Sequence, residues 1–289
     1  MPDPDLAPLA AHSAALAHLA AHAARMAVPL RARRRRLTAI AIGGGLAVTA
    51  DEALPSRGGL RTEDGAEVSV VGRDPSTDIA LLRIDGLEME AAAPDGAAVR
   101  AGALVAVAGM RDGAAVARFG MVAHAGPDWR SMRGGAIGPR IELDIDLPHD
   151  LEGAPAVASD GSLLGMAVPG PRGQVLVIPA DTIARVAKRL EERGNIPRGY
   201  LGLSLHPVRE EDGGMGLRVE GVEQGGPGAR AGVRRGDVIL GMDGAPLGGM
   251  RELARTLGPD SVGRTLPLDM RRGEERISLD LVVGERAQW

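Results

Sequence analysis

Cysteine is absent from this chain of 289 residues, and aromatic side chains make up only 1% of it. The absence of cysteine excludes disulfides, a thiol nucleophile and thiolate-bound metals. With so few aromatic residues, the core must be built from Ala, Val, Leu, Ile and Met, and the hydrophobic fraction of 44% is large enough for that. Lysine is almost absent as well, because Lys188 is the only one among 34 basic residues.

The chain also lacks an excess of positive charge and a long hydrophobic run. Its net charge of −4 gives no reason to expect nucleic-acid binding. Its N-terminus is acidic where an export signal would be basic, and the Ala-rich stretch that follows is too polar to cross a bilayer. These absences predict a cytoplasmic protein with no transmembrane segment, and no residue pattern predicts a cofactor.

The Ala-rich stretch predicts an amphipathic helix over about residues 5 to 27, which Pro29 ends. The basic run RARRRR follows at 31–36. Such a run can bind phosphate groups or acidic lipids. One short basic run is a weak motif, however, so a solvated strand or linker is the preferred interpretation.

Short apolar or alternating runs, separated by Gly, Pro and Asp, begin at Leu37 and predict a mainly β fold. Many short strands at close spacing favour an antiparallel barrel or sandwich over a parallel sheet with crossover helices. The expected strands cover residues 37–42, 46–49, 67–72, 79–84, 103–108, 115–123, 139–144, 155–158, 163–168 and 174–178.

A helix is predicted from Asp181 to Arg193, because its apolar residues fall on one face and Gly194 gives a stop signal. The segment NIPRG then serves as a linker to a second, smaller unit of about ninety residues. The second unit has expected strands near 200–206, 215–222, 236–241, 265–271 and 276–283, with a helix near 249–257.

Three segments in this order resemble the HtrA (DegP-like) family. They are VVGRDPSTDIALLRIDG at 70–86, VLVIPADTIARVAKRLEERGNIPRGYLGL at 175–203 and GGPGARAGVRRGDVILGMDGAPL at 225–247. The resemblance implies a trypsin-like double β-barrel with its connecting helix over 37–194, followed by a small α+β PDZ domain over 195–289. Residues 1–36 form an N-terminal Ala-rich helix and basic segment outside the resemblance.

The resemblance carries over to the catalytic positions one residue at a time. Asp78, in TDIALL, matches the catalytic Asp of the family, whereas Glu52 stands in the place of the general-base His and Glu152 in the place of the nucleophilic Ser. A serine hydroxyl becomes a nucleophile only when an imidazole takes its proton. Asp150 replaces a glycine beside the oxyanion hole, where a carboxylate would oppose the developing negative charge. The resemblance therefore implies a catalytically inactive pseudoprotease that serves as a scaffold.

Two other functions remain open at this point. If the barrels keep the family geometry, Glu52, Asp78 and Glu152 converge, and like charges raise at least one pKa or recruit a cation such as Ca²⁺, Mg²⁺ or Mn²⁺. The three carboxylates could then form a metal site or provide the acid and base of another type of hydrolase. Residual serine-type endopeptidase activity, with unrecognised residues, is the third alternative.

The segment YLGL at 200–203 matches the carboxylate-binding loop of the family's PDZ domains. The resemblance implies that backbone N–H groups of this loop bind the C-terminus of a peptide or protein, and that strand 204–208 pairs with it. The expected peptide-binding residues are Tyr200, Leu201, Gly202, Leu203, Leu253 and Leu257. A homo-oligomer remains possible, although the N-terminal aromatic residues through which HtrA relatives usually trimerise are missing here.

Overall fold

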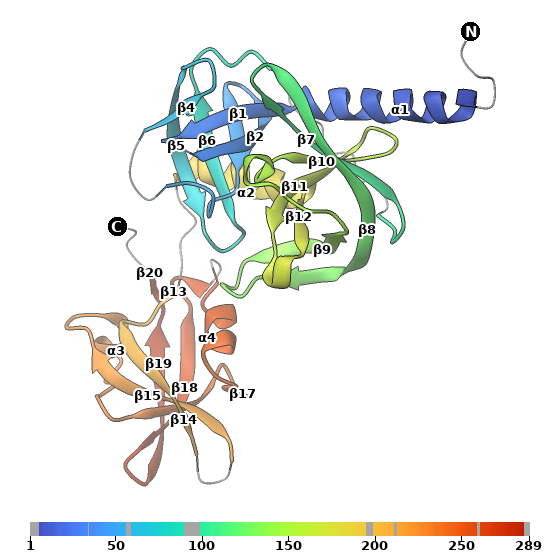
Figure 1. The fold of residues 1–289 in the computed structure, drawn as a ribbon. Helices are drawn as coiled ribbons and strands as arrows, with labels where there is room; N and C mark the ends of the chain where they lie inside the picture. Colours follow the sequence, from blue (N-terminus) through green and yellow to red (C-terminus); the bar gives the residue numbers. More distant parts are fainter. Residues whose placement is uncertain are drawn as a thin grey trace. The chain divides into compact units, whose positions relative to one another are not determined.

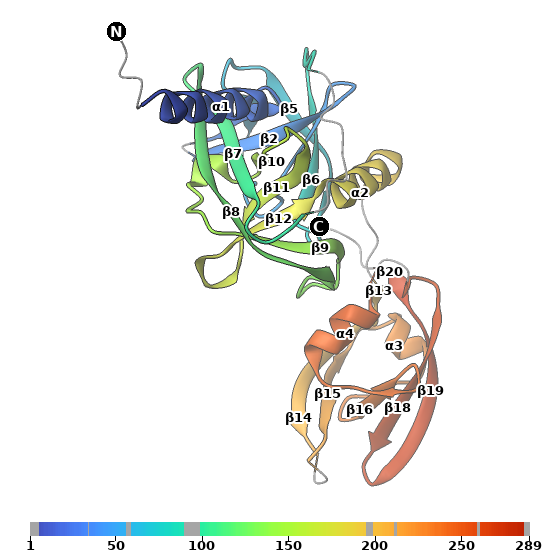
Figure 2. The same cartoon turned by 90° about the vertical axis from the view of Figure 1, so that its right-hand side faces the viewer.

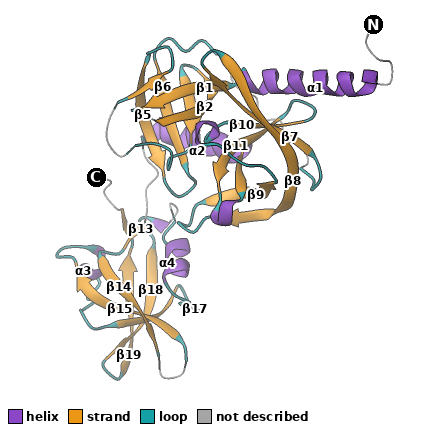
Figure 3. Ribbon diagram, viewed as in Figure 1, coloured by secondary structure: helices purple, strands orange, loops and turns teal. Residues whose placement is uncertain are grey.

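The computed structural model describes most of the chain and divides it into two compact units. One unit comprises Met1–Trp129 and Ala136–Asn195, and the other comprises Arg130–Gly135 and Ile196–Trp289. Strands dominate both units, with few helices (Figures 1 and 3). The described residues are 6–33, 35–55, 59–89, 99–194, 199–210, 213–258 and 261–285. Arg34 of the basic run and the linker residues 195–198 lie outside these ranges.

Six strands of the first unit form a closed antiparallel barrel in the order β1-β2-β3-β6-β5-β4 (Figure 1). The barrel closes where Leu30 and Ala32 of β1 pair with Thr62 and Leu60 of β4. Side chains that alternate along these strands fill the interior. The strands are β1 (Ala27–Ala32), β2 (Arg35–Gly43), β3 (Leu46–Thr49), β4 (Leu60–Thr62), β5 (Glu67–Asp74) and β6 (Ile79–Ile84).

A second closed barrel follows, in the order β10-β11-β12-β9-β8-β7. Its core is made of Val, Ile, Leu and Ala, as the scarcity of aromatic residues requires. The two barrels confirm the predicted mainly β, trypsin-like architecture. The strands are β7 (Leu104–Arg111), β8 (Ala114–Arg130), β9 (Ala136–Leu143), β10 (Pro155–Ala158), β11 (Leu163–Pro169) and β12 (Val175–Pro179), with the short 3-10 helices η2 (His149–Leu151) and η3 (Pro171–Gly173).

The first barrel begins at Ala27, whereas the sequence pattern predicted its start at Leu37. Strand β1 pairs with β2 from Ala27 to Ala32 and supplies the buried side chains of Val28 and Leu30. Its alternation is hidden in the sequence, because Pro29 and Arg31 interrupt the apolar residues. The basic run therefore lies mainly in two paired strands.

The N-terminal helix α1 (Ala7–Ala24) packs against β7 and β10 of the second barrel (Figure 1). Only Ala23 and Ala24 of this helix are buried. The predicted helix is present. Leu16, Leu19 and Ala20 are partly buried on the side that carries Ala23 and Ala24, whereas the N-terminal half of the helix is exposed all round. At its C-terminal end, His22 Nε2 lies 3.0 Å from the carbonyl oxygen of Gly161. No helix in the described ranges has the length and apolarity needed to span a membrane.

Helix α2 (Ala180–Arg193) has the predicted position and the predicted buried face. Ile183, Val186, Ala187 and Leu190 are buried on it, and the helix contacts β5 and β6 of the first barrel and β11 and β12 of the second. The helix thus packs on strands of both barrels (Figure 2).

The second unit contains an antiparallel sheet in the order β14-β15-β16-β18-β19, with β17 paired to β16. Strand β14 lies at one edge of this sheet. A separate pair, β13 and β20, joins the two ends of the unit. The elements are β13 (Gly199–Tyr200), β14 (Leu203–Arg209), β15 (Met215–Val222), α3 (Pro227–Arg230), β16 (Val238–Met242), β17 (Ala245–Pro246), α4 (Met250–Thr256), β18 (Thr265–Arg272), β19 (Glu275–Val282) and β20 (Gly284–Glu285).

Candidate functional site

Three acidic residues selected from the sequence lie on loops where the two barrels meet. Glu52 follows β3, and Asp78 immediately precedes β6 of the same barrel. Glu152 follows the 3-10 helix η2 in the second barrel and precedes β10. The backbone N–H of Thr38 in β2 donates to the Glu152 carbonyl oxygen at 3.0 Å, so this loop is attached to the first barrel.

Asp78 is held by the backbone of the loop that carries Glu52. The Glu52 N–H donates to Asp78 Oδ1 at 2.8 Å, and the Asp51 N–H donates to the Asp78 carbonyl oxygen at 3.3 Å. Burial, together with the charges of Glu52, Asp51 and Glu152, raises the pKa of Asp78 to about 7, although the bond from Glu52 opposes the shift. Asp78 therefore holds a proton over much of the range below neutral pH.

Glu152 is buried, with 6% of its surface exposed, and two basic side chains lie near it. Arg35 Nη2 lies 3.6 Å from Glu152 Oε2, and the exposed His149 places Nδ1 4.0 Å from the same oxygen. Burial raises the pKa of Glu152, the charges of Arg35 and His149 lower it, and the charge of Glu52 raises it further. The three carboxyl groups are thus close enough for their charges to interact.

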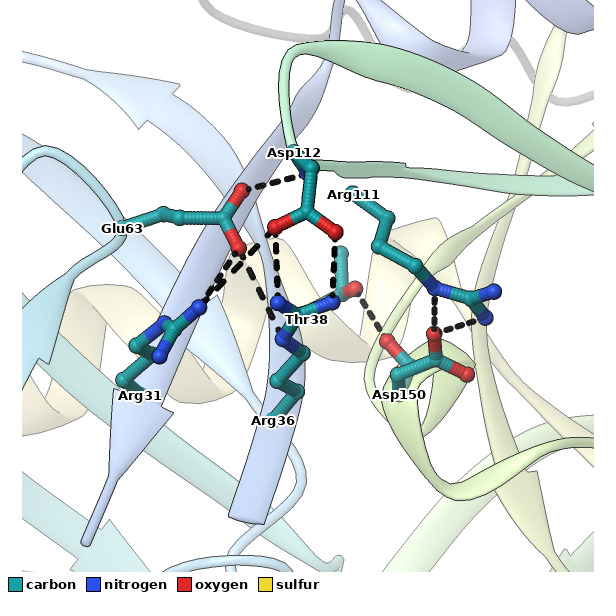
Figure 4. Close-up of polar contacts among 7 residues, drawn as sticks. All are labelled: Arg31, Arg36, Thr38, Glu63, Arg111, Asp112 and Asp150. Atoms are coloured by element: carbon teal, nitrogen blue, oxygen red, sulfur yellow. Dashed lines mark hydrogen bonds and ion pairs between the residues drawn. The ribbon is translucent and has the colours of Figure 1, made fainter. Parts of the chain in front are cut away.

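Asp150 carries its own cationic partner. Its carboxylate accepts hydrogen bonds from Arg111 of β7, one of them from Nε at 2.7 Å, and its carbonyl oxygen accepts from Thr38 Oγ1 at 2.7 Å (Figure 4). Asp150 is therefore an ion-paired side chain at the position where the family resemblance implies a glycine beside the oxyanion hole.

The basic run joins an ionic network beside this loop (Figure 4). Arg36 makes a two-pronged contact with Asp112 at 2.7 and 3.2 Å, and the Asp112 N–H donates to Glu63 Oε2 at 3.0 Å. Arg31 Nη2 lies 3.6 Å from Glu63 Oε1. Because these arginines and Arg35 are ion-paired in paired strands, the structure favours the strand interpretation of the run over a phosphate or lipid site.

Among the residues that the structure describes, Glu52, Asp78 and Glu152 are not arranged as a metal-binding group. Across the described part of the chain, no group of three or more His, Cys, Asp or Glu residues is arranged to hold a metal ion. The metal hypothesis for Glu52, Asp78 and Glu152 therefore gains no support, although their charges interact.

The side chains brought together at this site are carboxyl groups, which can act as general acid, general base or nucleophile. Two hydroxyl groups near them are engaged in hydrogen bonds, since Thr38 Oγ1 donates to the Asp150 carbonyl and Thr49 Oγ1 donates to the Thr38 carbonyl at 2.7 Å. With its raised pKa, Asp78 can supply a proton near neutral pH.

A groove in the second unit brings together all six of the expected peptide-binding residues. It lies along the edge strand β14 and helix α4. Leu201 and Leu253 belong to the buried core, whereas the partly buried Leu203 and Leu257 and the exposed Met250 offer apolar surface to a ligand. The groove-lining residues of 199–257 are Gly199, Tyr200, Leu201, Gly202, Leu203, Ser204, Leu205, Gly221, Val222, Glu223, Met250, Leu253, Ala254 and Leu257.

The loop at the end of this groove presents unused backbone donors. Among the described residues, the N–H groups of Leu201 and Gly202 donate to no acceptor, whereas their carbonyl oxygens accept from Gly228 and Glu223. Gly202 has φ of +69°, and a Cβ there would lie 3.1 Å from Pro227 Cδ. A side chain at position 202 would therefore be strained as well as crowded.

Sequence reasoning missed several residues of this groove, among them Met132, Arg133, Glu223 and Met250. Glu223 comes directly after β15, and its N–H donates to the Gly202 carbonyl at 2.9 Å. The pairing of two strands predicted near 200–206 and 215–222 could have placed Glu223 opposite the loop. Met250 begins α4, a helix that was expected at that place.

Two family models match the chain in the order of its two folds. A trypsin-like peptidase domain matches residues 37–166, and a PDZ domain matches residues 199–283. Probable periplasmic serine endoproteases of the DegP-like type are similar in sequence. The one from Pseudomonas putida (strain W619) is 27% identical over 241 residues, and the one from Bartonella henselae is 28% identical over 277 residues. The chain is an HtrA/DegP-like trypsin-like peptidase homologue with a C-terminal PDZ domain.

This HtrA-like chain spans about half the length of the curated relatives that it matches. The alignment covers 78% of the chain and 50% of the Pseudomonas protein, and 86% of the chain and 54% of the Bartonella protein. Among solved structures, the HtrA-type protease AlgW with a decapeptide covers 94% of the chain and 99% of its own length, with a TM-score of 0.70 and 21% identity. The serine endoprotease from Yersinia pestis covers 93% and 98%, also with a TM-score of 0.70 and 21% identity. At these identities the two structures show that the fold is shared.

Proposed function

We propose that this HtrA-like chain binds the C-termini of peptides or proteins in the groove of its PDZ domain. The observation that carries the proposal is the pair of unused N–H groups of Leu201 and Gly202 at the end of the groove. Successive backbone donors form a small site for an anion such as a terminal carboxylate. Strand β14, at the edge of its sheet, can add a peptide as a further strand.

The apolar part of the groove favours a bound peptide whose C-terminal side chain is apolar. Leu203 and Leu257 are partly exposed beside the loop, so an apolar C-terminal residue buries their surface. The decapeptide in the structure of the HtrA-type protease AlgW supports the proposal by analogy, since that protein shares the fold.

An apolar peptide with a free C-terminal carboxylate is expected to bind the full chain at least about tenfold more tightly than its C-terminal amide, because hydrogen bonds to a charged group are about twice as strong as neutral ones. Fluorescence anisotropy titrations of the two peptides measure the ratio. A Leu203→Asp variant should lose most of the binding, because it adds a like charge and removes apolar surface. Equal affinities for acid and amide would contradict the proposal.

We further propose that the barrel domain does not hydrolyse peptide bonds and acts as a scaffold for the PDZ domain. The proposal is supported by the carboxylates of Glu52 and Glu152, which stand where a general base and a nucleophile are required. It is also supported by Asp150, whose carboxylate pairs with Arg111 in place of an oxyanion hole.

Unfolded casein is expected to remain intact after prolonged incubation with the purified full chain, as followed by gel electrophoresis. The physical reason is that a protease without its triad retains only about 10³–10⁴-fold acceleration over water. This remaining acceleration depends on substrate binding and on an oxyanion hole. Casein cleavage that a Glu152→Ala variant abolishes would overturn the proposal. Labelling of the chain by a fluorophosphonate probe would also count against it.

The pKa of Asp78 favours one second candidate, a hydrolase of another bond type. A carboxyl group with a pKa of about 7 beside two further carboxyl groups is suited to general acid–base catalysis. Hydrolysis of a nitrophenyl ester or glycoside that Asp78→Asn abolishes, without loss of folding, would favour this candidate over the scaffold.

A further inference from the structure

Glu223 gives the carboxylate end of the PDZ groove a negative charge. Among the described residues that line the groove, Glu223 is the one acidic side chain, and Arg133 is the one basic side chain. Its Oε2 atom accepts a hydrogen bond from Tyr200 Oη at 2.8 Å. The bond holds the carboxylate against the first residue of the loop that offers the unused N–H groups.

The Glu223 carboxylate lies directly beside that loop. A Cβ added to Gly202 would lie 3.4 Å from Glu223 Oε2, and one added to Gly226 would lie 3.1 Å from the same atom. The Glu223 backbone is fixed there as well, since its N–H donates to the Gly202 carbonyl oxygen and its carbonyl accepts from Gly226. The charge is therefore part of the rigid wall of the groove.

In the part of the chain that the structure describes, the Glu223 side chain makes no ion pair, although Arg133 also lines the groove. Within the described ranges, the polar partner of the Glu223 side chain is the uncharged hydroxyl of Tyr200. Other acids of the same domain are ion-paired. Asp237 pairs with Arg272, and Glu210 pairs with Arg271. Glu223 thus differs from these two structural acids, and its charge remains available to a ligand.

A ligand that ends in a carboxylate brings a second negative charge to this end of the groove. A cationic side chain close to the terminus offsets the repulsion and forms an ion pair with Glu223. In an extended peptide, successive side chains point to opposite faces. When the last side chain enters the apolar pocket, the penultimate one points away from it and is free to meet the charged wall.

We propose that Glu223 makes the groove selective for C-termini with a basic penultimate side chain and an apolar last residue. This specificity rests on the proposed binding of C-termini in the same groove, and it adds the class of peptide that is preferred. Tyr200 acts as a positioning residue, because its hydroxyl fixes the carboxylate that meets the ligand.

The test uses the full chain and three decapeptides of one neutral sequence that end in Lys-Leu, Gln-Leu or Glu-Leu. For the native chain we expect the Lys peptide to bind about two- to fivefold more tightly than the Gln peptide, the range of an exposed ion pair. The Glu peptide should bind about two- to fivefold more weakly than the Gln peptide, because its side chain repels Glu223. Both differences should shrink at high salt, because exposed charges are screened.

Two variants locate the effect. Glu223→Gln removes the charge and keeps the acceptor for Tyr200, so the three peptides should bind this variant with nearly equal affinities. Glu274→Gln makes the same change in the exposed turn before β19, outside the groove, and should keep the native order. An unchanged preference for the Lys peptide in Glu223→Gln would overturn the inference.

The amidated Lys-Leu peptide separates this inference from the proposed function. If the acid binds more tightly than the amide but the three acids bind alike, groove binding stands and the role of Glu223 is wrong. If acid and amide bind alike, the carboxylate site is wrong and the inference falls with it.

Discussion

Replacement of Asp78 by Asn is expected to stabilise the chain by about 2–4 kcal/mol at pH 8 and to leave its stability nearly unchanged at pH 4. The folded chain raises the pKa of Asp78 from 3.8 to about 7. Between these values the folded state binds more protons than the unfolded state, so the free energy of unfolding falls as pH rises. The stability that protonated Asp78 gives to the folded chain is fully present below about pH 4 and is lost as the pH rises through 7.

Asparagine suits this position for two reasons. Its side-chain oxygen can still accept the hydrogen bond from the Glu52 N–H. Asp78 has φ of +59°, a left-handed conformation that Asn adopts more readily than most residues. The substitution therefore removes the buried negative charge without adding strain, and the neighbouring charges of Glu52 and Glu152 lose a repelling partner.

Urea unfolding of the native chain and the variant at pH 4 and pH 8 measures the effect. The control is Asp128→Asn, which neutralises an exposed carboxylate on β8 and should change stability by a few tenths of a kcal/mol at both values. A stability difference between native chain and Asp78→Asn that is the same at pH 4 and pH 8 would contradict the raised pKa.

Much of the fold could be predicted from local pattern. Strands such as β6 and β12 are short apolar runs bounded by turn residues, and α2 has a helical apolar face, so residue order alone located them. Strand β1 was not predicted because Pro29 and Arg31 interrupt its apolar residues, and because β4, one of its two partners, is distant in the sequence. Arg31 is matched by Glu63, a contact that no local pattern reveals.

For the candidate sites as well, some features could be predicted from the sequence and others depend on the folded structure. The family resemblance implied that Glu52, Asp78 and Glu152 lie close together, and it implied a peptide-binding groove at the YLGL segment. The pKa of Asp78 depends on how deeply the two barrels bury it, which the sequence does not contain. The pairing of Glu223 with Tyr200 depends on the register of β14 against β15, and a shift by one residue would turn the side chain elsewhere.

Replacement of Gly153 by Ala is expected to destabilise the chain by more than about 3 kcal/mol, because the site has neither the backbone freedom nor the space for a side chain. Gly153 has φ of +85°. An added Cβ would clash with the Thr38 carbonyl oxygen and lie 2.6 Å from Thr49 Oγ1. These two atoms belong to β2 and β3 and are hydrogen-bonded to each other, so neither can move without breaking that bond.

Gly113→Ala is the matched control. Gly113 has a similar φ of +79°, but a Cβ there would meet nothing within 4 Å. Its substitution should destabilise the chain by only about 1–2 kcal/mol, the difference in energy between left-handed and ordinary backbone. Comparing the urea midpoints of the two variants separates the cost of the steric clash from the cost of the left-handed backbone. Equal losses would mean that the loop behind Glu152 can shift, and that the position of this carboxylate is not fixed by the close approach of Gly153 to the first barrel.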